Sequence, residues 1–301
     1  MQSVSFRRVL ATLSGGPDSV LLTYLLKLYG FEIIALHCNF HLRGDESNRD
    51  ALIVEEFCKS NNISLIVKDF DIKKYKRENK GESLEMACRK VRYEWFQEIK
   101  EREGFDRIST GHNADDNIET LFLNLLRGSG TRGLKGMEYD NGEIWRPLLS
   151  LHRDDVIDLI SEFNLDYITD STNLESDFKR NFLRNEIFPL IKTKWSGFNT
   201  AIDSAISNLR AENKVVESVI NKILKECGDK LSKDIILNFE APLLLIRRFI
   251  DDMQPFSTTP SEILEALKAS KPHIRRWRLR MGEVMLRNSV IYKQRDDQPL
   301  K

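Results

Sequence analysis

The stretch LATLSGGPDSVLLTYLLKLYG, residues 10–30, decides the fold. An apolar run ends at Gly15 and Gly16, and a leucine-rich segment of helical period begins near Asp18, so the order predicts a strand, a tight turn and a helix. Backbone N–H groups and the helix dipole at such a turn form an anion site. The turn lacks the lysine of a P-loop, but Asp18 can hold a cation, which suits a nucleotide handled through Mg²⁺. In the alternative interpretation, Asp18 or Ser19 only caps the helix.

The same alternation continues along the first two thirds of the chain. Apolar or β-branched runs at 9–14, 31–38, 63–70 and 106–112 each precede a helical pattern. This order is typical of βαβ units and predicts an α/β fold, with a Rossmann-like parallel sheet covered by helices on both faces.

The texture changes after Pro189, where strand-like runs become rare. We expect helices over 198–224, 241–253 and 261–269, and two short strands within 272–295. The sequence therefore predicts a catalytic domain over 1–190, and a helical linker with a small α+β C-terminal domain over 191–301.

Composition sets broad limits on function. The 301 residues carry 46 basic and 46 acidic side chains, so a nucleic-acid partner would have to meet a local basic patch. The four cysteines form no C-x-x-C pair, which argues against a zinc knuckle, an iron–sulfur site or a disulfide framework. We find no signal-peptide pattern and no apolar run that approaches the roughly 18 residues of a membrane span, and we expect a cytoplasmic protein without membrane contact.

A second informative stretch is GHNADDNIETLFLNLLRGSGTRGLKGM, residues 111–137. An apolar stripe at 118, 121, 122 and 125 indicates a helix. If the helix extends back to the start of the stretch, His112, Asp116 and Glu119 share another face. A simple capping pair of Asn113 with Asp116 is the alternative.

These motifs carry a resemblance. SGGPDS, residues 14–19, resembles the SGGxDS pyrophosphate loop of the ATP-pyrophosphatase superfamily, and residues 111–137 resemble the GHxxDDxxET signature of the tRNA(Ile)-lysidine synthetase family. Four further pieces agree with that family in order and spacing: HCNFHLRGDESNRD (37–50), MACRKVRYEWF (86–96), RPLL (146–149) and DSTNLESDFKRNFLRNEIFPLI (170–191). The tail after Ala241 matches less well, and the chain is shorter than many relatives.

The resemblance implies an activity. ATP would adenylate the C2 carbonyl oxygen of the wobble cytidine in the tRNA(Ile) that bears a CAU anticodon, and L-lysine would then displace AMP. The implied ATP-binding residues are Ser14, Gly15, Gly16, Pro17, Asp18 and Ser19, with Asp18 also assisting the Mg²⁺ ion. Asp116 and Glu119 would hold lysine, and His112, Arg92 and Arg184 would surround the reacting nucleotide.

Two basic segments are candidates for contact with tRNA phosphates. The glycine-rich segment 127–136 contains Arg127, Arg132 and Lys135, although a solvated connection would look the same. The tail carries Arg275, Arg276, Arg278 and Arg280 in a strand-like pattern, although charged strands also protect sheet edges. The sequence is also compatible with a homodimer.

Two other functions are compatible with parts of the sequence. A tRNA thiolase of the same superfamily would need nucleophilic or cluster-binding cysteines, and the missing C-x-x-C pair counts against it. A non-catalytic RNA-binding protein would keep the basic tail but would not need Asp18, Asp116 and Glu119 together.

Overall fold

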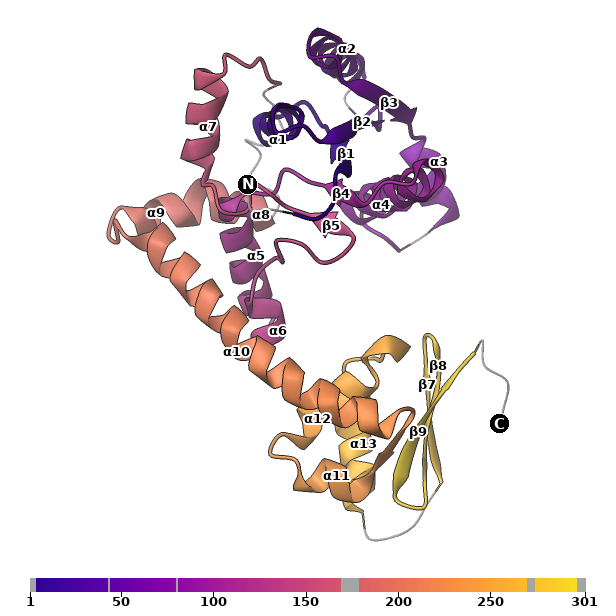
Figure 1. Ribbon diagram of the computed structural model, residues 1–301. Coiled ribbons are helices and arrows are strands. Elements are labelled where there is room, and N and C mark those ends of the chain that lie inside the picture. The colour runs from indigo at the N-terminus through magenta and orange to yellow at the C-terminus, as the bar shows by residue number, and fades with distance from the viewer. Residues whose placement is uncertain (1–3, 43, 80, 169–178, 270–273, 297–301) are drawn as a thin grey trace. The chain divides into compact units, whose positions relative to one another are not determined.

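The computed structural model describes residues 4–42, 44–79, 81–168, 179–269 and 274–296. The chain divides into two compact units, Met1–Arg210 and Ala211–Lys301 (Figure 1). This division falls inside helix α10 (Phe198–Cys227), whereas the boundary expected near residue 190 precedes that helix. The first nine residues of the motif at 170–191 lie outside the described residues.

The first unit contains a five-stranded parallel sheet in the order β3-β2-β1-β4-β5. Its strands are β1 (Arg8–Thr12), β2 (Glu32–Asn39), β3 (Ser64–Asp69), β4 (Arg107–Ser109) and β5 (Ile144–Trp145). The predicted Rossmann-like α/β fold is confirmed. The strand order reverses between β1 and β4, and ligands of such sheets bind at the carboxyl ends of the strands at this point.

Both faces of this sheet are covered, because successive side chains of a strand point to opposite faces. Val9 and Ala11 pack with α1 (Pro17–Leu28), α2 (Asp45–Ser60) and α7 (Arg153–Glu162). Leu10 and Leu36 pack instead against α4 (Leu84–Glu103). Figure 1 shows α4 on the side of the sheet opposite α1. The core therefore fixes the position of the two turns that follow β1 and β4.

The described part of the first unit has further helical segments after β3, after β4 and after α7. They are α3 (Ile72–Glu78), α5 (Ala114–Leu126), α6 (Thr131–Leu134), α8 (Lys179–Phe182), the π-helical turn η2 (Leu183–Ile187) and α9 (Phe188–Lys192). The rings of Phe122, Phe188 and Phe198 join α5, α9 and α10, with centroids 5.0–6.0 Å apart. This cluster holds η2 against the polar side of α5.

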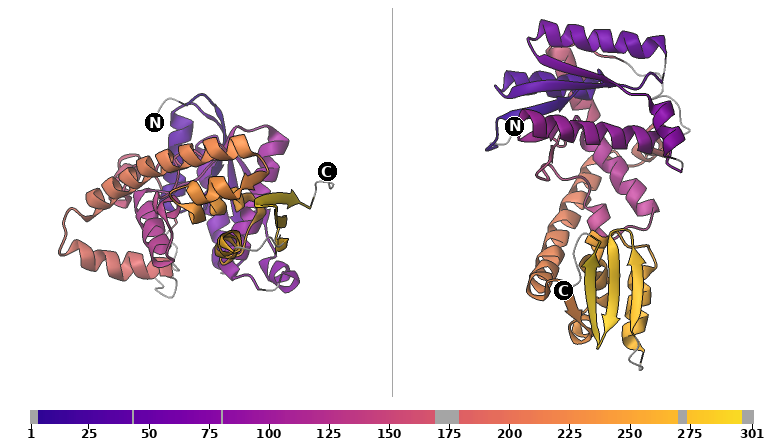
Figure 2. Two further views of the ribbon diagram at one scale, coloured as in Figure 1. Left: turned by 90° about the horizontal axis from the view of Figure 1, so that it is seen from below. Right: turned by 90° about the vertical axis from the view of Figure 1, so that its right-hand side faces the viewer.

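The second unit has a four-stranded antiparallel sheet in the order β6-β9-β8-β7, with one face covered by helices (Figure 2). The strands are β6 (Lys230–Ser232), β7 (Arg275–Leu279), β8 (Gly282–Arg287) and β9 (Val290–Arg295). The helices are α11 (Lys233–Asn238), α12 (Pro242–Phe249), the 3-10 turn η3 (Asp251–Met253) and α13 (Thr259–Lys268). Leu231, Ile246 and Val284 are buried in its core.

The expectation of two strands in the tail is wrong, because the tail forms three. The turn between β8 and β9 consists of Asn288 and Ser289, with φ of 50° and 61°. Two successive residues with positive φ are typical of a tight hairpin turn, which normally contains glycine. Since this turn has no glycine, the sequence pattern did not reveal it. Within the described ranges, no helix has both the length and the apolarity needed to cross a bilayer.

Candidate active site

The turn after β1 forms a loop whose backbone amides are organised by serine hydroxyls. Ser19 Oγ accepts hydrogen bonds from the backbone N–H groups of Ser14 (3.1 Å) and Gly15 (3.2 Å). The N-cap of α1 is Gly16, which has no side chain to cap it, so the interpretation of Asp18 or Ser19 as the cap is wrong. Gly15 has φ of +94°, which favours glycine. The serine hydroxyls therefore fix the conformation of the loop at the start of α1.

The turn after β4 packs directly against the start of α1. A Cβ atom on Gly111 would lie 2.9 Å from the backbone carbon of Asp18, so this position has room only for glycine. The close approach brings Asn113 to Asp18, and Asn113 Nδ2 donates to Asp18 Oδ1 at 2.7 Å. The carboxyl ends of the two central strands thus form one site.

Asn113 also caps α5. Its Oδ1 accepts from the N–H of Asp116 (3.0 Å), and Asp116 Oδ2 accepts from the N–H of Asn113 (3.1 Å). The capping alternative is confirmed, but Asp116 Oδ1 remains available for other contacts. Because α5 begins at Ala114, the expectation that His112 lies on the same helix is wrong; Asp116 and Glu119 do share a face.

Arg184 connects these two carboxylates. Its Nε lies 2.6 Å from Glu119 Oε1, and its Nη2 lies 3.0 Å from Asp116 Oδ1. Arg184 lies in the π-helical turn η2, which precedes Pro189, a residue without the N–H that an α-helical bond to Asn185 would need. π-Helical turns occur frequently at functional sites.

Glu119 has a second carboxylate oxygen that is not fully satisfied. The residue is 1% exposed, and its Oε2 has no hydrogen-bond partner among the described residues. Arg180 Nε lies 3.4 Å from Oε2 as an ion pair without hydrogen-bond geometry. Burial raises the pKa of Glu119, and the Arg184 guanidinium opposes that rise. A cationic ligand would stabilise the ionised carboxylate.

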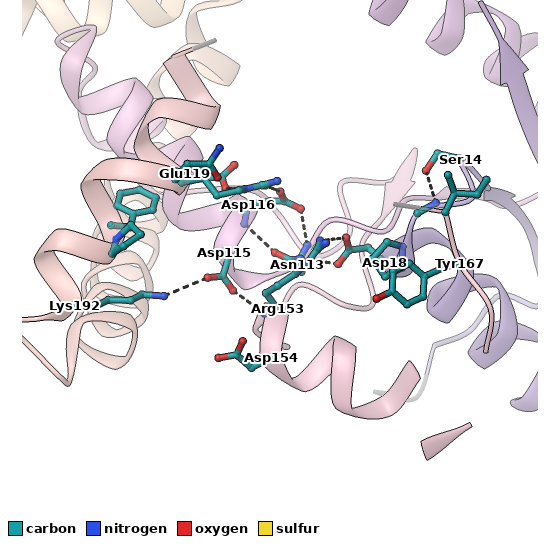
Figure 3. Close-up of a pocket in the computed structure, with 17 residues that line it drawn as sticks. Ser14, Asp18, Asn113, Asp115, Asp116, Glu119, Arg153, Asp154, Tyr167 and Lys192 are labelled. Carbon is teal, nitrogen blue, oxygen red and sulfur yellow. Dashed lines mark hydrogen bonds and ion pairs between the residues drawn. The ribbon is translucent and has the colours of Figure 1, made fainter. Parts of the chain in front are cut away.

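Two cavities meet at the loop after β1. The larger, of about 650 Å³, is lined by Asp116, Glu119, Arg153, Arg184 and Lys192 among others. The smaller, of about 280 Å³, has a wall that includes the side chains of Leu13, Leu36, Tyr93 and Phe96. Ser14, Gly16 and Asp18 line both cavities. Figure 3 shows the larger cavity, with Asp18, Asn113 and Arg153 adjacent.

The smaller cavity contains His112 and Arg92, so the structure separates these predicted residues from Arg184. Burial lowers the pKa of His112 to about 4. The negative charge of Asp116 opposes this decrease, whereas the positive charges of Arg146, Arg89 and Arg180 add to it. His112 is therefore neutral near pH 7, and Thr110 Oγ1 lies 2.7 Å from its Nδ1. The Arg92 guanidinium lies 5.3 Å from the centre of the Phe40 ring.

The sequence did not reveal the ion pair of Asp18 with Arg153, whose Nη1 lies 2.6 Å from Asp18 Oδ2. Burial raises the pKa of Asp18, and Arg153 is the largest opposing influence. Arg153 lies at the start of α7, where Asp115 Oδ2 accepts its backbone N–H at 2.8 Å. These residues are 135 positions apart, and no sequence spacing links them.

The glycine-rich segment 127–136 is anchored to α5. Asn124 Nδ2 donates to Gly133 O (2.8 Å), and Asn117 Oδ1 accepts from the N–H of Met137 (2.7 Å). Residues 131–134 form the short helix α6, which contains Arg132; Arg127 precedes it, and Lys135 is its C-cap residue. The contact of these three side chains with tRNA stays a prediction.

The predicted basic residues of the tail are exposed in the second unit. Arg276 and Arg278 share one face of β7, and strand alternation places Arg275 on the other. Arg278 makes a bidentate pair with Asp296 at 2.8 Å, and the Arg280 guanidinium lies 5.8 Å from the centre of the Phe256 ring.

Cysteine chemistry has little support at this site. Cys38 lines the smaller cavity, and burial raises the pKa of its thiol to about 12, so the reactive thiolate is scarce near neutral pH. The described residues contain no group of three or more His, Cys, Asp or Glu side chains arranged to hold a metal ion.

Comparison with known proteins shows similarity to one family model and to several curated proteins. Residues 1–191 match the family model of the PP-loop domain. The chain is 39% identical to a tRNA(Ile)-lysidine synthase of Bacteroides thetaiotaomicron over 224 residues, which is 74% of this chain and 51% of that protein. It is 38% identical to a tRNA(Ile)-lysidine synthase of Parabacteroides distasonis over 264 residues, which is 87% of this chain and 60% of that protein. The matched part thus spans about half to three fifths of these relatives.

A solved structure with a similar fold is the U34-tRNA thiolase NcsA from Methanococcus maripaludis, described with its [4Fe-4S] cluster. The alignment covers 68% of this chain and 72% of that chain, with a TM-score of 0.56 and 20% sequence identity. At this identity the likeness concerns the fold alone.

Proposed function

This chain belongs to the PP-loop domain family, and we propose that it is an ATP-dependent tRNA(Ile)-lysidine synthase. The observation that carries the proposal is the meeting of the loop at 14–19 with Asp116 and Glu119 around one cavity, at the point where the strand order reverses. Both elements belong to the two motifs that predicted this activity. A protein that only binds RNA would not need to bring Asp18, Asp116 and Glu119 together.

We place the ATP phosphates at residues 14–19 and the adenosine in the smaller cavity. The loop lies at the start of α1, where the positive end of the helix dipole favours anions. The cavity walls contributed by Leu36, Tyr93 and Phe96 suit the apolar surface of a purine base. His112 and Arg92 face this nucleotide in the proposal, His112 as a neutral hydrogen-bonding group and Arg92 as a cation.

The donor set near Asp18 fits a Mg²⁺ ion that arrives with ATP. Mg²⁺ commonly uses one or two protein carboxylates together with substrate phosphates, and it does not need a cage built from protein alone. Asn113 donates to two carboxylates here, through Nδ2 to Asp18 Oδ1 and through its backbone N–H to Asp116 Oδ2. Such an ion, when bound, neutralises phosphate charge.

We place L-lysine and the wobble cytidine in the larger cavity. Among the described residues, five carboxylates and three cationic side chains line it: Asp18, Asp115, Asp116, Glu119 and Asp154, against Arg153, Arg184 and Lys192. A substrate with two ammonium groups suits this excess of negative charge. No described residue donates a hydrogen bond to the buried Oε2 of Glu119, and a lysine ammonium group would supply such a donor.

The reaction then has two steps. The C2 carbonyl oxygen of the cytidine attacks the α-phosphorus of ATP, the bond between that phosphorus and the bridging oxygen breaks, and pyrophosphate leaves. An uncharged lysine amine next attacks C2 and loses a proton, and the C2–O bond breaks to release AMP. The positive charges of the arginines stabilise the negative charge that develops on the departing pyrophosphate. We assign the reaction to the cytoplasm, where tRNA, ATP and free lysine occur together.

The test is incubation of the protein with ATP, L-lysine and an isoleucine tRNA transcript bearing the CAU anticodon. We expect AMP, pyrophosphate and covalently bound lysine in equal amounts, and adenylated tRNA when lysine is omitted. A transcript with a different wobble base is the control. Pyrophosphate release that does not depend on tRNA, or sulfur incorporation in place of lysine, would contradict the proposal.

A further inference from the structure

Arg153 is a cation at the phosphate loop that does not belong to the loop itself. The turn at 14–19 has no lysine, whereas a P-loop uses one to reach the terminal phosphates of a nucleotide. Arg153 comes from α7, and its Nη1 reaches Oδ2 of Asp18 at 2.6 Å. A different element of the fold thus brings a positive charge to the place where the loop lacks one.

The other cations of the larger cavity are committed elsewhere. Arg184 is held by Glu119 and Asp116, at 2.6 and 3.0 Å. Lys192 Nζ lies 3.8 Å from Asp115, and Figure 3 shows it far from Asp18 across the cavity. Among the described cations of this cavity, Arg153 is therefore the one that pairs directly with the phosphate loop.

The attachment of Arg153 allows its guanidinium to move while its backbone stays fixed. Asp115 accepts its backbone N–H at 2.8 Å, and the N-cap residue His152 is held between Asp115 (3.1 Å) and Asp203 (2.9 Å). The Arg153 side chain is 42% exposed, whereas that of Asp18 is 21% exposed. The long side chain can exchange partners without a change in α7.

We propose that Arg153 is a catalytic residue that binds the β- and γ-phosphates of ATP, exchanging its ion pair with Asp18 for contacts with the polyphosphate. The inference rests on the proposed function, since it takes ATP as the nucleotide. The planar guanidinium matches phosphate oxygens through two parallel hydrogen bonds, which a lysine ammonium group cannot reproduce. Arg153 then stabilises the negative charge that develops on pyrophosphate as it leaves.

The test compares the binding of ATP with that of AMP in Arg153→Met and Arg153→Lys. Loss of a charged hydrogen-bond partner should weaken ATP binding roughly 10- to 100-fold in Arg153→Met. The loss should be smaller in Arg153→Lys, which keeps the positive charge. AMP has no β- or γ-phosphate, so its affinity should stay unchanged. The matched control is Arg102→Met. Arg102 is an exposed arginine on α4, away from both cavities, and its Nε lies 2.9 Å from Glu103 Oε1.

The outcomes separate this inference from the proposed function. Equal losses for ATP and AMP, or unchanged ATP affinity with a lower melting temperature, would show that Arg153 only neutralises Asp18, and would overturn the inference. A selective loss of ATP affinity supports it, even if the wild-type protein forms no lysidine. In that case the proposed function alone would fail.

Discussion

Arginine–carboxylate pairs occur in both units of the chain, but at different depths. Arg184 in the first unit is paired with Glu119, which is 1% exposed. Arg278 in the second unit is paired with Asp296, and the two side chains are 68% and 52% exposed. An exposed pair contributes about 0–1 kcal/mol, whereas removal of one partner of a buried pair leaves an uncompensated charge and costs several times more.

This difference shows that the first unit keeps buried carboxylates ionised at a cost in free energy. Burial raises the pKa of both Asp18 and Glu119, even though arginines oppose the rise. Each carboxylate is thus ionised at a cost, and a bound cation would relieve that cost. We therefore expect single charge changes to have large effects in the first unit and small effects in the second.

The largest expected effect is that of Asp18→Ala. Since Asp18 lies at the phosphate loop and is the proposed metal ligand, adenylation should fall at least about 100-fold. Asp140→Ala is the matched control, because Asp140 also pairs with an arginine, Arg107 at 3.0 Å, at the surface. The measurement is AMP formed from tRNA and ATP, together with the melting temperature. Normal AMP formation by Asp18→Ala would remove this carboxylate from the mechanism.

Glu119→Gln should affect the second half-reaction. The variant keeps the shape of the side chain but loses its charge, and the lysine KM should rise roughly 10- to 100-fold. Arg184 still has Asp116 as a partner at 3.0 Å, so adenylation should survive. Adenylated tRNA should accumulate when lysine is limiting and discharge when lysine is in large excess.

The control for Glu119→Gln lies in the second unit. Glu217 Oε1 pairs with Arg248 Nε at 2.7 Å, so Glu217→Gln makes the same change in a pair outside the site. Its lysine KM should equal that of the wild type. If Glu119→Gln shows normal lysine dependence, or fails already at adenylation, these carboxylates act in the other half of the reaction.

His112 links burial to stability. Its pKa is lowered to about 4 in the folded state, so at a pH between about 4 and 6.5 the unfolded chain binds a proton that the folded chain does not. Stability is therefore full above pH 6.5 and falls as the pH drops towards 4, by up to about 3 kcal/mol. His112→Gln should lose less unfolding free energy than the wild type between pH 7 and 5, measured by chemical denaturation. His41→Gln, at an exposed histidine paired with Asp69, is the control. An identical pH dependence in wild type and His112→Gln would contradict the burial argument.

The sequence predicted the features that depend on neighbouring residues. Apolar runs and glycine turns predicted the parallel sheet, and the spacing of Asp116 and Glu119 placed both on one face of α5. The two-residue strand β5 is too short to leave a pattern. The capping geometry that excludes His112 from α5 depends on Asn113, which also bonds Asp18.

Other features that escaped prediction depend on tertiary contacts. The ion pair of Arg153 with Asp18 joins residues from two helices, α7 and α1, that are 135 positions apart in the sequence. The assignment of His112 and Arg92 to one cavity and Arg184 to the other likewise follows from the packing of α4 and η2. Spacing along one helix cannot report such contacts.

The smallest expected effect concerns the basic residues of β7. If Arg276 and Arg278 meet tRNA phosphates, replacing either arginine should reduce the slope of log K against log salt by about one, with only a few-fold loss of affinity. Arg278→Ala should have the weaker effect of the two, because a phosphate must first displace Asp296 from its two 2.8 Å hydrogen bonds. Arg276 lies 3.8 Å from Glu283 and is less firmly held. Arg247→Ala, at an exposed arginine on α12, is the control for charge alone. Equal slopes for the wild type and both β7 variants would assign these arginines to protection of the sheet edge, since β7 is the outer strand of its sheet.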